Sequence, residues 1–301
     1  MSTVRVGTRG SLLSRRQTEA VLAALRGLHP GVRFEVVVIQ TRGDRWAGPL
    51  AHPSGPGLFV AELEQALREG AVDLAVHSLK DLPTDPTPGL AIAAIPPRED
   101  PRDALVAHAP SLAQLPPGAR VGTSSPRRAA QLRIYRKDLE VVPLRGNVDT
   151  RIRKVRTGEV DAAVLAVAGL VRGGWEEEIA ERLDPEVMLP APGQGAIALQ
   201  VREDDHRVRG LVEPLDDPLT RAAVSAERAF LRGLGGGCAI PAAALATWEG
   251  AGSVLRLRGL VAAPDGSWVV RVERVGSIAA AEEMGRQAAE AVCGGLPTLA
   301  S

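Results

Sequence analysis

The stretch Ala119-Arg120-Val121-Gly122-Thr123-Ser124-Ser125-Pro126-Arg127-Arg128 contains the step from a strand to a helix that sets the class of this fold. Its first four residues are typical of a short buried strand, and a serine followed by proline is the pattern of a helix N-cap and first helical residue. We therefore expect a helix over 125–136 with two arginines in its first turn. Similar steps recur along the chain, which favours an α/β protein.

The two arginines of this first turn imply a bound anion. A helix N-terminus carries partial positive charge, so each cation there costs up to about 1 kcal/mol. A charge-assisted hydrogen bond to a carboxylate contributes about 1.5–3 kcal/mol and outweighs that cost. Arginine also lies beside glycine or serine at three other expected strand ends, in residues 8–11, 41–44 and 145–151. Several anion-binding loops are thus predicted.

The composition is that of a globular protein without net charge, so that any anion-binding site must come from a local cluster of basic residues. The chain has 301 residues, of which 45% are hydrophobic, enough for two or three domains. Its 36 basic and 36 acidic residues cancel, which argues against general attraction to nucleic acid or membrane. Neither a signal peptide nor an apolar run of membrane-spanning length is recognisable, and no Cys/His spacing suggests a metal site. We expect a cytoplasmic protein.

The order of expected elements predicts three domains. Residues 1–97 with 193–215 form one α/β lobe, residues 98–192 form a second, and residues 216–301 form an α+β domain of three strands and helices. Two crossings of the chain between the lobes are typical of a hinged cleft. Residues 42–57 contain too much glycine and proline for regular structure and are expected to form a lid.

Two segments carry residues capable of chemistry. The buried-looking strand at 73–76 ends in His77-Ser78-Leu79-Lys80-Asp81, and ligands bind at strand ends in open α/β sheets, so Asp81 is a candidate acid or base. A surface ion pair between Lys80 and Asp81 explains these residues equally well, and His77 is expected to be structural. Cys238 lies on a loop of small residues, where it is either a packed thiol or an accessible attachment point.

Taken together, these segments resemble the hydroxymethylbilane synthase family, also called the porphobilinogen deaminases. The resemblance follows the chain in order: Thr-Arg-Gly-Ser at 8, Thr-Arg-Gly-Asp at 41, Gly-Leu-Phe-Val at 57, Val-His-Ser-Leu-Lys-Asp at 76, Arg-Glu-Asp-Pro-Arg-Asp at 98, Gly-Thr-Ser-Ser-Pro-Arg-Arg at 122, Leu-Arg-Gly-Asn-Val at 144, Leu-Ala-Val-Ala-Gly-Leu at 165, Pro-Gly-Gln-Gly-Ala at 192 and Gly-Gly-Cys at 236. No single motif is decisive, but their order and spacing are highly specific.

The resemblance implies two lobes similar to type II periplasmic binding proteins, a third domain, and a monomeric transferase. It also implies a dipyrromethane cofactor joined by a thioether to Cys238. Four porphobilinogen molecules are condensed head to tail on that cofactor with loss of ammonia, and hydrolysis releases the linear tetrapyrrole. The alternative is a two-lobed binding protein for a small polyanionic ligand without catalysis, which leaves the third domain and its cysteine unexplained.

By motif position the resemblance also implies roles for individual residues. Asp81 is implied to be catalytic, because a carboxylate there would stabilise positive charge on a pyrrole nitrogen. Guanidinium groups match the acetate and propionate groups of pyrrole units. The implied cofactor contacts are Cys238, Lys80, Asp81, Ser125, Arg127, Arg128, Arg145 and Gly146. The implied substrate contacts are Arg9, Ser11, Phe59, Arg145, Arg151, Arg172 and Gln194. One departure lies in the lid, where His52 and Pro56 stand at positions that often carry lysine in relatives.

Overall fold

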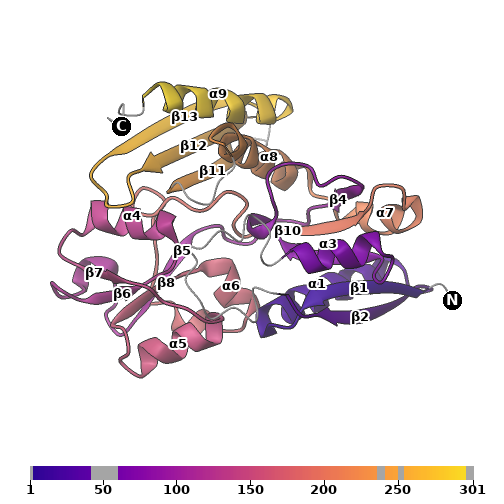
Figure 1. The fold of residues 1–301 in the computed structure, drawn as a ribbon, viewed down its shortest axis with the longest axis horizontal. Helices are drawn as coiled ribbons and strands as arrows, with labels where there is room; N and C mark the ends of the chain where they lie inside the picture. Colours follow the sequence, from indigo (N-terminus) through magenta and orange to yellow (C-terminus); the bar gives the residue numbers. More distant parts are fainter. Residues whose placement is uncertain (1–2, 42–59, 236–240, 250–253, 296–301) are drawn as a thin grey trace. The chain divides into compact units, whose positions relative to one another are not determined.

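The computed structural model describes residues 3–41, 60–235, 241–249 and 254–295. The internal contacts of the chain define two compact units (Figure 1). The first comprises Met1–Glu99 and Gly195–Arg221, and the second comprises Asp100–Gln194 and Ala222–Ser301. The chain therefore passes from one unit to the other at residues 99–100, 194–195 and 221–222.

The first unit is built on a five-stranded mixed sheet with the strand order β2-β1-β3-β10-β4. The first three strands in this order are parallel, and β10 is inserted antiparallel between β3 and β4. Alternating strand residues divide the core, so that α1 and α7 pack on one face and α3 packs on the other. The bounds are β1 (Thr3–Arg9), α1 (Leu12–Leu28), β2 (Arg33–Ile39), α3 (Ala61–Arg68), β3 (Leu74–Ser78), β4 (Leu90–Ala94), β10 (Ile197–Arg202) and α7 (His206–Val212).

The second unit contains a sheet of matching topology, with the strand order β7-β6-β8-β5-β9. Here β5 is the antiparallel strand in fourth place, and like β10 it follows a passage of the chain from the other unit. Helix α4 packs on one face, and α5 and α6 pack on the other. The bounds are β5 (Asp103–Ala107), β6 (Arg120–Gly122), α4 (Pro126–Tyr135), β7 (Glu140–Val142), α5 (Val148–Arg156), β8 (Ala162–Ala166), α6 (Val167–Arg172) and β9 (Glu181–Arg182).

The remainder of the second unit is a three-stranded antiparallel sheet with helices on both faces. Helices α8 and α9 cover one face around the fully buried Phe230, and Figure 1 shows α9 lying along the strands. Helix α4 packs on the other face through Ala130. The bounds are α8 (Pro218–Gly233), β11 (Ala242–Glu249), β12 (Val254–Ala262), β13 (Val269–Ser277) and α9 (Ala281–Gly294).

Two mixed α/β sheets and a three-stranded antiparallel sheet with helices confirm the predicted fold class. Strands β5 and β9 and helices α6 and α7 were not predicted from the sequence. Strand β5 starts at the last residue of the motif at 98–103, and its apolar run of Ala104 to Ala107 is too short for periodicity to distinguish a strand from a buried helical turn. Among the residues that the structure describes, no helix is long and apolar enough to cross a membrane.

A buried carboxylate on α8 joins two parts of the second unit. Glu227 is completely buried, and its two carboxylate oxygens accept hydrogen bonds from the backbone N–H groups of Gly193, at 2.7 Å, and Ala246, at 2.8 Å. The segment before residue 195 is thereby held against β11. This segment also carries Gln194, one of the predicted contact residues.

Candidate carboxylate-binding and catalytic site

The first turn of α4 has the local structure that its sequence predicts. Ser125 is the N-cap, its hydroxyl accepts a hydrogen bond from the backbone N–H of Arg128, and Pro126 is the first helical residue. Arg127 and Arg128 lie in the first turn and are both buried. The expected N-cap and the expected position of the two arginines are therefore confirmed.

The partner of both arginines is a carboxylate of the protein itself. Asp103, the first residue of β5, is completely buried. Its Oδ2 accepts a hydrogen bond from Nη1 of Arg127 at 2.7 Å, and its Oδ1 accepts from Nε and Nη2 of Arg128 at 3.0 and 2.7 Å. Burial by itself raises the pKa of Asp103, but the two guanidinium groups outweigh it and hold that pKa well below its usual value.

The two guanidinium groups differ in which of their nitrogens donate hydrogen bonds to the protein. Arg127 donates through Nη1 alone, to Asp103 and to the backbone oxygen of Leu189 at 2.7 Å. Arg128 donates through Nε and Nη2 to Asp103, and through Nη1 to the backbone oxygen of Val164 at 2.9 Å. Within the described residues, Nε and Nη2 of Arg127 have no hydrogen-bond acceptor. Arg127 therefore keeps one edge of its guanidinium group for a ligand.

Gln194 lies beside this ion cluster and is completely buried. Its Nε2 donates to Oδ1 of Asp103 at 2.9 Å and to the backbone oxygen of Pro101 at 2.8 Å, and its Oε1 lies 3.5 Å from Nη2 of Arg128. The sequence motif implied that Gln194 contacts substrate. In the structure it braces the carboxylate that holds the two arginines.

A second pair of arginines follows β7: Arg145 lies in the loop before α5, and Arg151 lies in α5. Gly146 has a φ of +106°, in the region that favours glycine, and its backbone oxygen accepts a hydrogen bond from Nε of Arg151 at 2.8 Å. Burial, with the like charges of Arg128 and Arg145, lowers the pKa of Arg151 to about 10. Neither Arg145 nor Arg151 forms an ion pair with a described residue. This part of the second unit therefore has an excess of positive charge that an anionic ligand would neutralise.

The first unit brings together residues from the ends of two neighbouring parallel strands. Arg9 ends β1, and Asp81 closes the short 3₁₀ turn Leu79–Asp81 that follows β3. Nη1 of Arg9 lies 4.0 Å from Oδ2 of Asp81, and the Asp81 side chain is 34% exposed. Asp81 therefore pairs with Arg9, across the ends of the two strands. Ser11 is the N-cap of α1 and accepts from the backbone N–H of Ser14.

His77 lies at the end of the same strand but is buried and 5% exposed. Burial lowers its pKa to about 4, and the charge of Arg9 acts in the same direction. The imidazole is therefore neutral at neutral pH.

The other predicted residues are distributed as follows. Arg172 ends α6 and is half-buried, and Lys80 is exposed in the turn before Asp81. Phe59, Cys238 and the lid with His52 and Pro56 lie outside the described residues. In the described ranges no cluster of histidine, cysteine and carboxylate side chains is suited to a metal ion.

Sequence reasoning missed Asp103, although it stands in the motif at 98–103. A usable signal was present, since a carboxylate directly before an apolar run is rarely buried unless it is paired.

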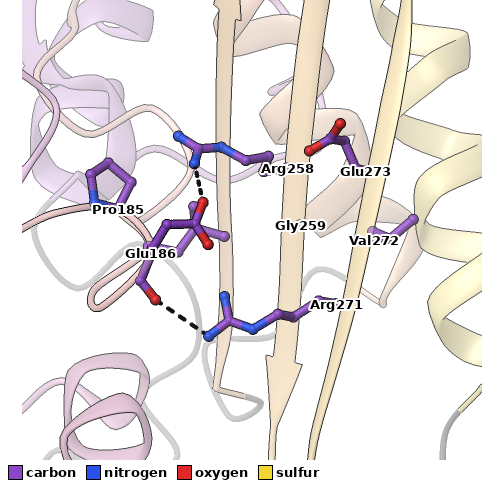
Figure 2. A pocket seen from close by; sticks show the side chains of 8 residues that line it. Pro185, Glu186, Arg258, Gly259, Arg271, Val272 and Glu273 are labelled. Carbon is purple, nitrogen blue, oxygen red and sulfur yellow. Dashed lines mark hydrogen bonds and ion pairs between the residues drawn. The ribbon is translucent and has the colours of Figure 1, made fainter. Parts of the chain in front are cut away.

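A cavity of about 260 Å³ lies where β12 and β13 meet the segment 185–189 (Figure 2). Figure 2 shows Arg258 reaching the Glu186 carboxylate and Arg271 directed at the Glu186 backbone oxygen. Nη1 of Arg258 lies 2.6 Å from Oε1 of Glu186. Leu189 lines this cavity, and its backbone oxygen accepts from Arg127. The wall of the cavity thus includes the segment that helps to hold Arg127.

Comparisons with known proteins agree with these motifs. The family described as porphobilinogen deaminase, dipyromethane cofactor binding domain, matches residues 4–210, and the porphobilinogen deaminase C-terminal domain matches residues 221–293. The porphobilinogen deaminase of Syntrophus aciditrophicus is 49% identical over 294 residues, covering 97% of this chain and 95% of the relative. That of Acidothermus cellulolyticus is 52% identical over 295 residues, covering 96% and 88%.

Among solved structures, the methionine-binding protein MetQ has a TM-score of 0.45 and 15% identity, covering 71% of this chain and 89% of its own. The two family matches together extend over nearly all of the sequence. This chain belongs to the porphobilinogen deaminase family.

Proposed function

We propose that the chain is a hydroxymethylbilane synthase. It deaminates porphobilinogen, joins four molecules head to tail on a dipyrromethane cofactor bound through Cys238, and releases the linear tetrapyrrole by hydrolysis. The observation that supports this most directly is the positive charge of Arg145 and Arg151, which form no ion pair with a described residue, in a chain with deaminase relatives. Each pyrrole unit carries an acetate and a propionate, and guanidinium groups pair bidentately with such carboxylates.

The residues of the second unit fit a ligand with several carboxylates. Arg127 offers its remaining guanidinium edge, and Arg145 and Arg151 bring charges without a described counter-ion. When bound, the cofactor supplies the pyrrole carbon to which the first substrate is joined. The proposed cofactor contacts are Cys238, Lys80, Asp81, Ser125, Arg127, Arg128, Arg145 and Gly146. The proposed substrate contacts are Arg9, Ser11, Phe59, Arg145, Arg151, Arg172 and Gln194.

Asp81 is the proposed catalytic residue. Positive charge develops on the substrate's pyrrole nitrogen when the aminomethyl nitrogen leaves as ammonia. It develops again on the nitrogen of the chain's terminal pyrrole when the free α-carbon of that ring attacks the electrophile so formed. An ionised carboxylate directed at that nitrogen stabilises both steps. Arg9 holds the Asp81 carboxylate from one side, while the 34% exposure of its side chain leaves it accessible to substrate. We infer that Asp81 also takes part in proton transfer to the leaving amine. As the protonated acid it would donate its proton, the amine would depart as ammonia, and the carboxylate so formed would face the positive pyrrole nitrogen.

We also propose how the whole protein is organised. Three domains are formed by residues 1–97 with 193–215, residues 98–192, and residues 216–301, and the enzyme acts as a monomer in the cytoplasm. Light scattering of the purified protein tests the monomer directly. A mass of two or more chains would contradict it.

The intact mass of the denatured protein tests the proposed function. Protein from a host that makes porphobilinogen should exceed its sequence mass by two linked pyrrole units, and Cys238→Ser protein should not. Absence of the added mass, also after incubation with preformed hydroxymethylbilane, would support the alternative of a two-lobed polyanion-binding protein. The two family matches, which include the C-terminal domain, favour the enzyme.

A further inference from the structure

We propose that Asp103 is a positioning residue of the carboxylate-binding site, and that because of Asp103 the two arginines Arg127 and Arg128 have different roles. Arg128 is anchored by Asp103, whereas Arg127 is held at one end and presents its other edge to a ligand carboxylate. This inference rests on the proposed function, in which the first turn of α4 binds the carboxylates of the cofactor.

The Asp103 carboxylate is a permanent part of the cluster. Its two oxygens accept hydrogen bonds from Arg127, Arg128 and Gln194, and its side chain is completely buried. Removing the arginines from Asp103 would leave a buried charge without a partner, which is strongly unfavourable. A ligand carboxylate therefore adds to this cluster and does not displace Asp103.

The different roles of the two arginines follow from which of their guanidinium nitrogens donate hydrogen bonds to the protein. The Nε and Nη2 atoms form the side edge of a guanidinium group, which binds a carboxylate with two parallel hydrogen bonds. In Arg128 both atoms of this edge donate to Asp103. In Arg127 the protein uses Nη1 alone, through Asp103 and Leu189, and no described residue accepts from the side edge. Arg127 is therefore the one of the two that can bind a ligand carboxylate bidentately.

Pre-positioning matters because the guanidinium group is at the end of a flexible side chain. An anchor on Nη1 fixes the plane of the Arg127 group before the ligand arrives and reduces the entropy lost on binding. In Asp103→Asn one acceptor oxygen becomes an N–H donor directed at a guanidinium group, so one arginine loses its anchor. In Asp103→Glu the charge is kept, but one additional methylene displaces the carboxylate.

The rate of cofactor attachment measures this role without depending on turnover. Apoprotein from a host unable to make porphobilinogen is mixed with preformed hydroxymethylbilane, and the covalently modified fraction is followed by intact mass. We expect Asp103→Asn to load about tenfold more slowly than the unmodified sequence, and Asp103→Glu to load more slowly as well. Arg127→Lys should load more slowly too, because an ammonium group has no bidentate edge.

Asp73→Asn is the matched control for the loss of an ion pair. The Asp73 side chain is 8% exposed and pairs with Arg5 at 2.8 Å and Arg202 at 3.3 Å, all within the first unit. The Asp73→Asn variant should have a lower melting temperature, as Asp103→Asn should, but it should take up the cofactor at the rate of the unmodified sequence. If Asp103→Asn does not accumulate as folded protein, the loading rate of Asp103→Glu by itself tests the positioning role.

The outcomes separate this inference from the proposed function. Loading of Asp103→Glu at the unmodified rate would overturn the positioning role, while the proposed function would stand. Equal slowing in Asp73→Asn and Asp103→Asn would also overturn it, because general destabilisation would then explain both. If the unmodified apoprotein itself gains no pyrrole mass, it is the proposed function that fails.

Discussion

Nη1 of Arg9 lies 4.0 Å from Oδ2 of Asp81, although α1, β2, α3 and β3 all lie between the two residues in the sequence. They meet because β1 and β3 are adjacent and parallel, so that their carboxyl ends lie at the same edge of the sheet. The pair holds the candidate catalytic carboxylate in place and leaves its side chain one-third exposed.

Asp81→Asn should retain the cofactor and lose most of its turnover. The amide has nearly the same shape as the carboxylate but lacks the negative charge that stabilises the developing cation. We expect kcat to fall by about 100-fold or more, with the covalent pyrrole mass unchanged. Steady-state rates and intact mass measure the two properties separately.

Asp204→Asn, on an exposed residue of the same unit, is the control and should have normal turnover. Normal kcat in Asp81→Asn would remove the catalytic role of Asp81.

His77 should make the stability of the protein depend on pH between about 4 and 6.5. Burial lowers its folded-state pKa to about 4, whereas the unfolded-state value is near 6.5. The unfolded state binds more protons in this window, so the free energy of unfolding is full above it and decreases as the pH falls through it, by about 3 kcal/mol in total.

His77→Gln should reduce this slope in urea unfolding measured from pH 4 to pH 8. His206→Gln, on an exposed residue, should leave it unchanged. An unaltered slope in His77→Gln would show that other groups cause the pH dependence.

Gly146→Ala should destabilise the loop that carries Arg145. The added Cβ would lie 2.6 Å from Cγ2 of Thr150, and the φ of +106° is unfavourable for alanine. We expect a loss of about 2–3 kcal/mol in the free energy of unfolding and slower cofactor loading.

Gly158→Ala is the matched control, because Gly158 also has a positive φ, of +73°, but no atom lies within 4 Å of its added Cβ. It should cost about 1 kcal/mol and leave loading unaffected. Equal losses at both positions would argue against the steric explanation.

Arg151→Gln should weaken ligand binding without weakening the fold. The lowered pKa of Arg151 reports burial and repulsion by Arg128 and Arg145, and both are relieved when the charge is removed. The loss of its hydrogen bond to Gly146 offsets part of that gain, so the apoprotein should remain within about 1 kcal/mol of its original stability. Cofactor loading should nevertheless slow.

Thermal unfolding and loading kinetics on the same samples test this pair of effects. Clear destabilisation with unchanged loading would make Arg151 a structural residue.

The sequence alone determined the local structure of the site. The Ser125-Pro126 pair specified the start of α4, because an N-cap side chain and the fixed φ of proline act within one helical turn. The strand-like segments at 73–76 and 119–122 likewise indicated the strands β3 and β6. The ordered motifs indicated the family, and the comparisons confirm it.

Only the tertiary structure decided which anion accompanies the arginines of α4. Asp103 lies 24 residues before Arg127, on a strand that periodicity did not distinguish, and it reaches the helix because β5 pairs antiparallel with β8. Strand pairing and register depend on contacts between distant segments, so no local pattern contains them. The lowered pKa values of Asp103, Arg151 and His77 have the same origin, since burial and charge proximity exist only once the sheets have assembled.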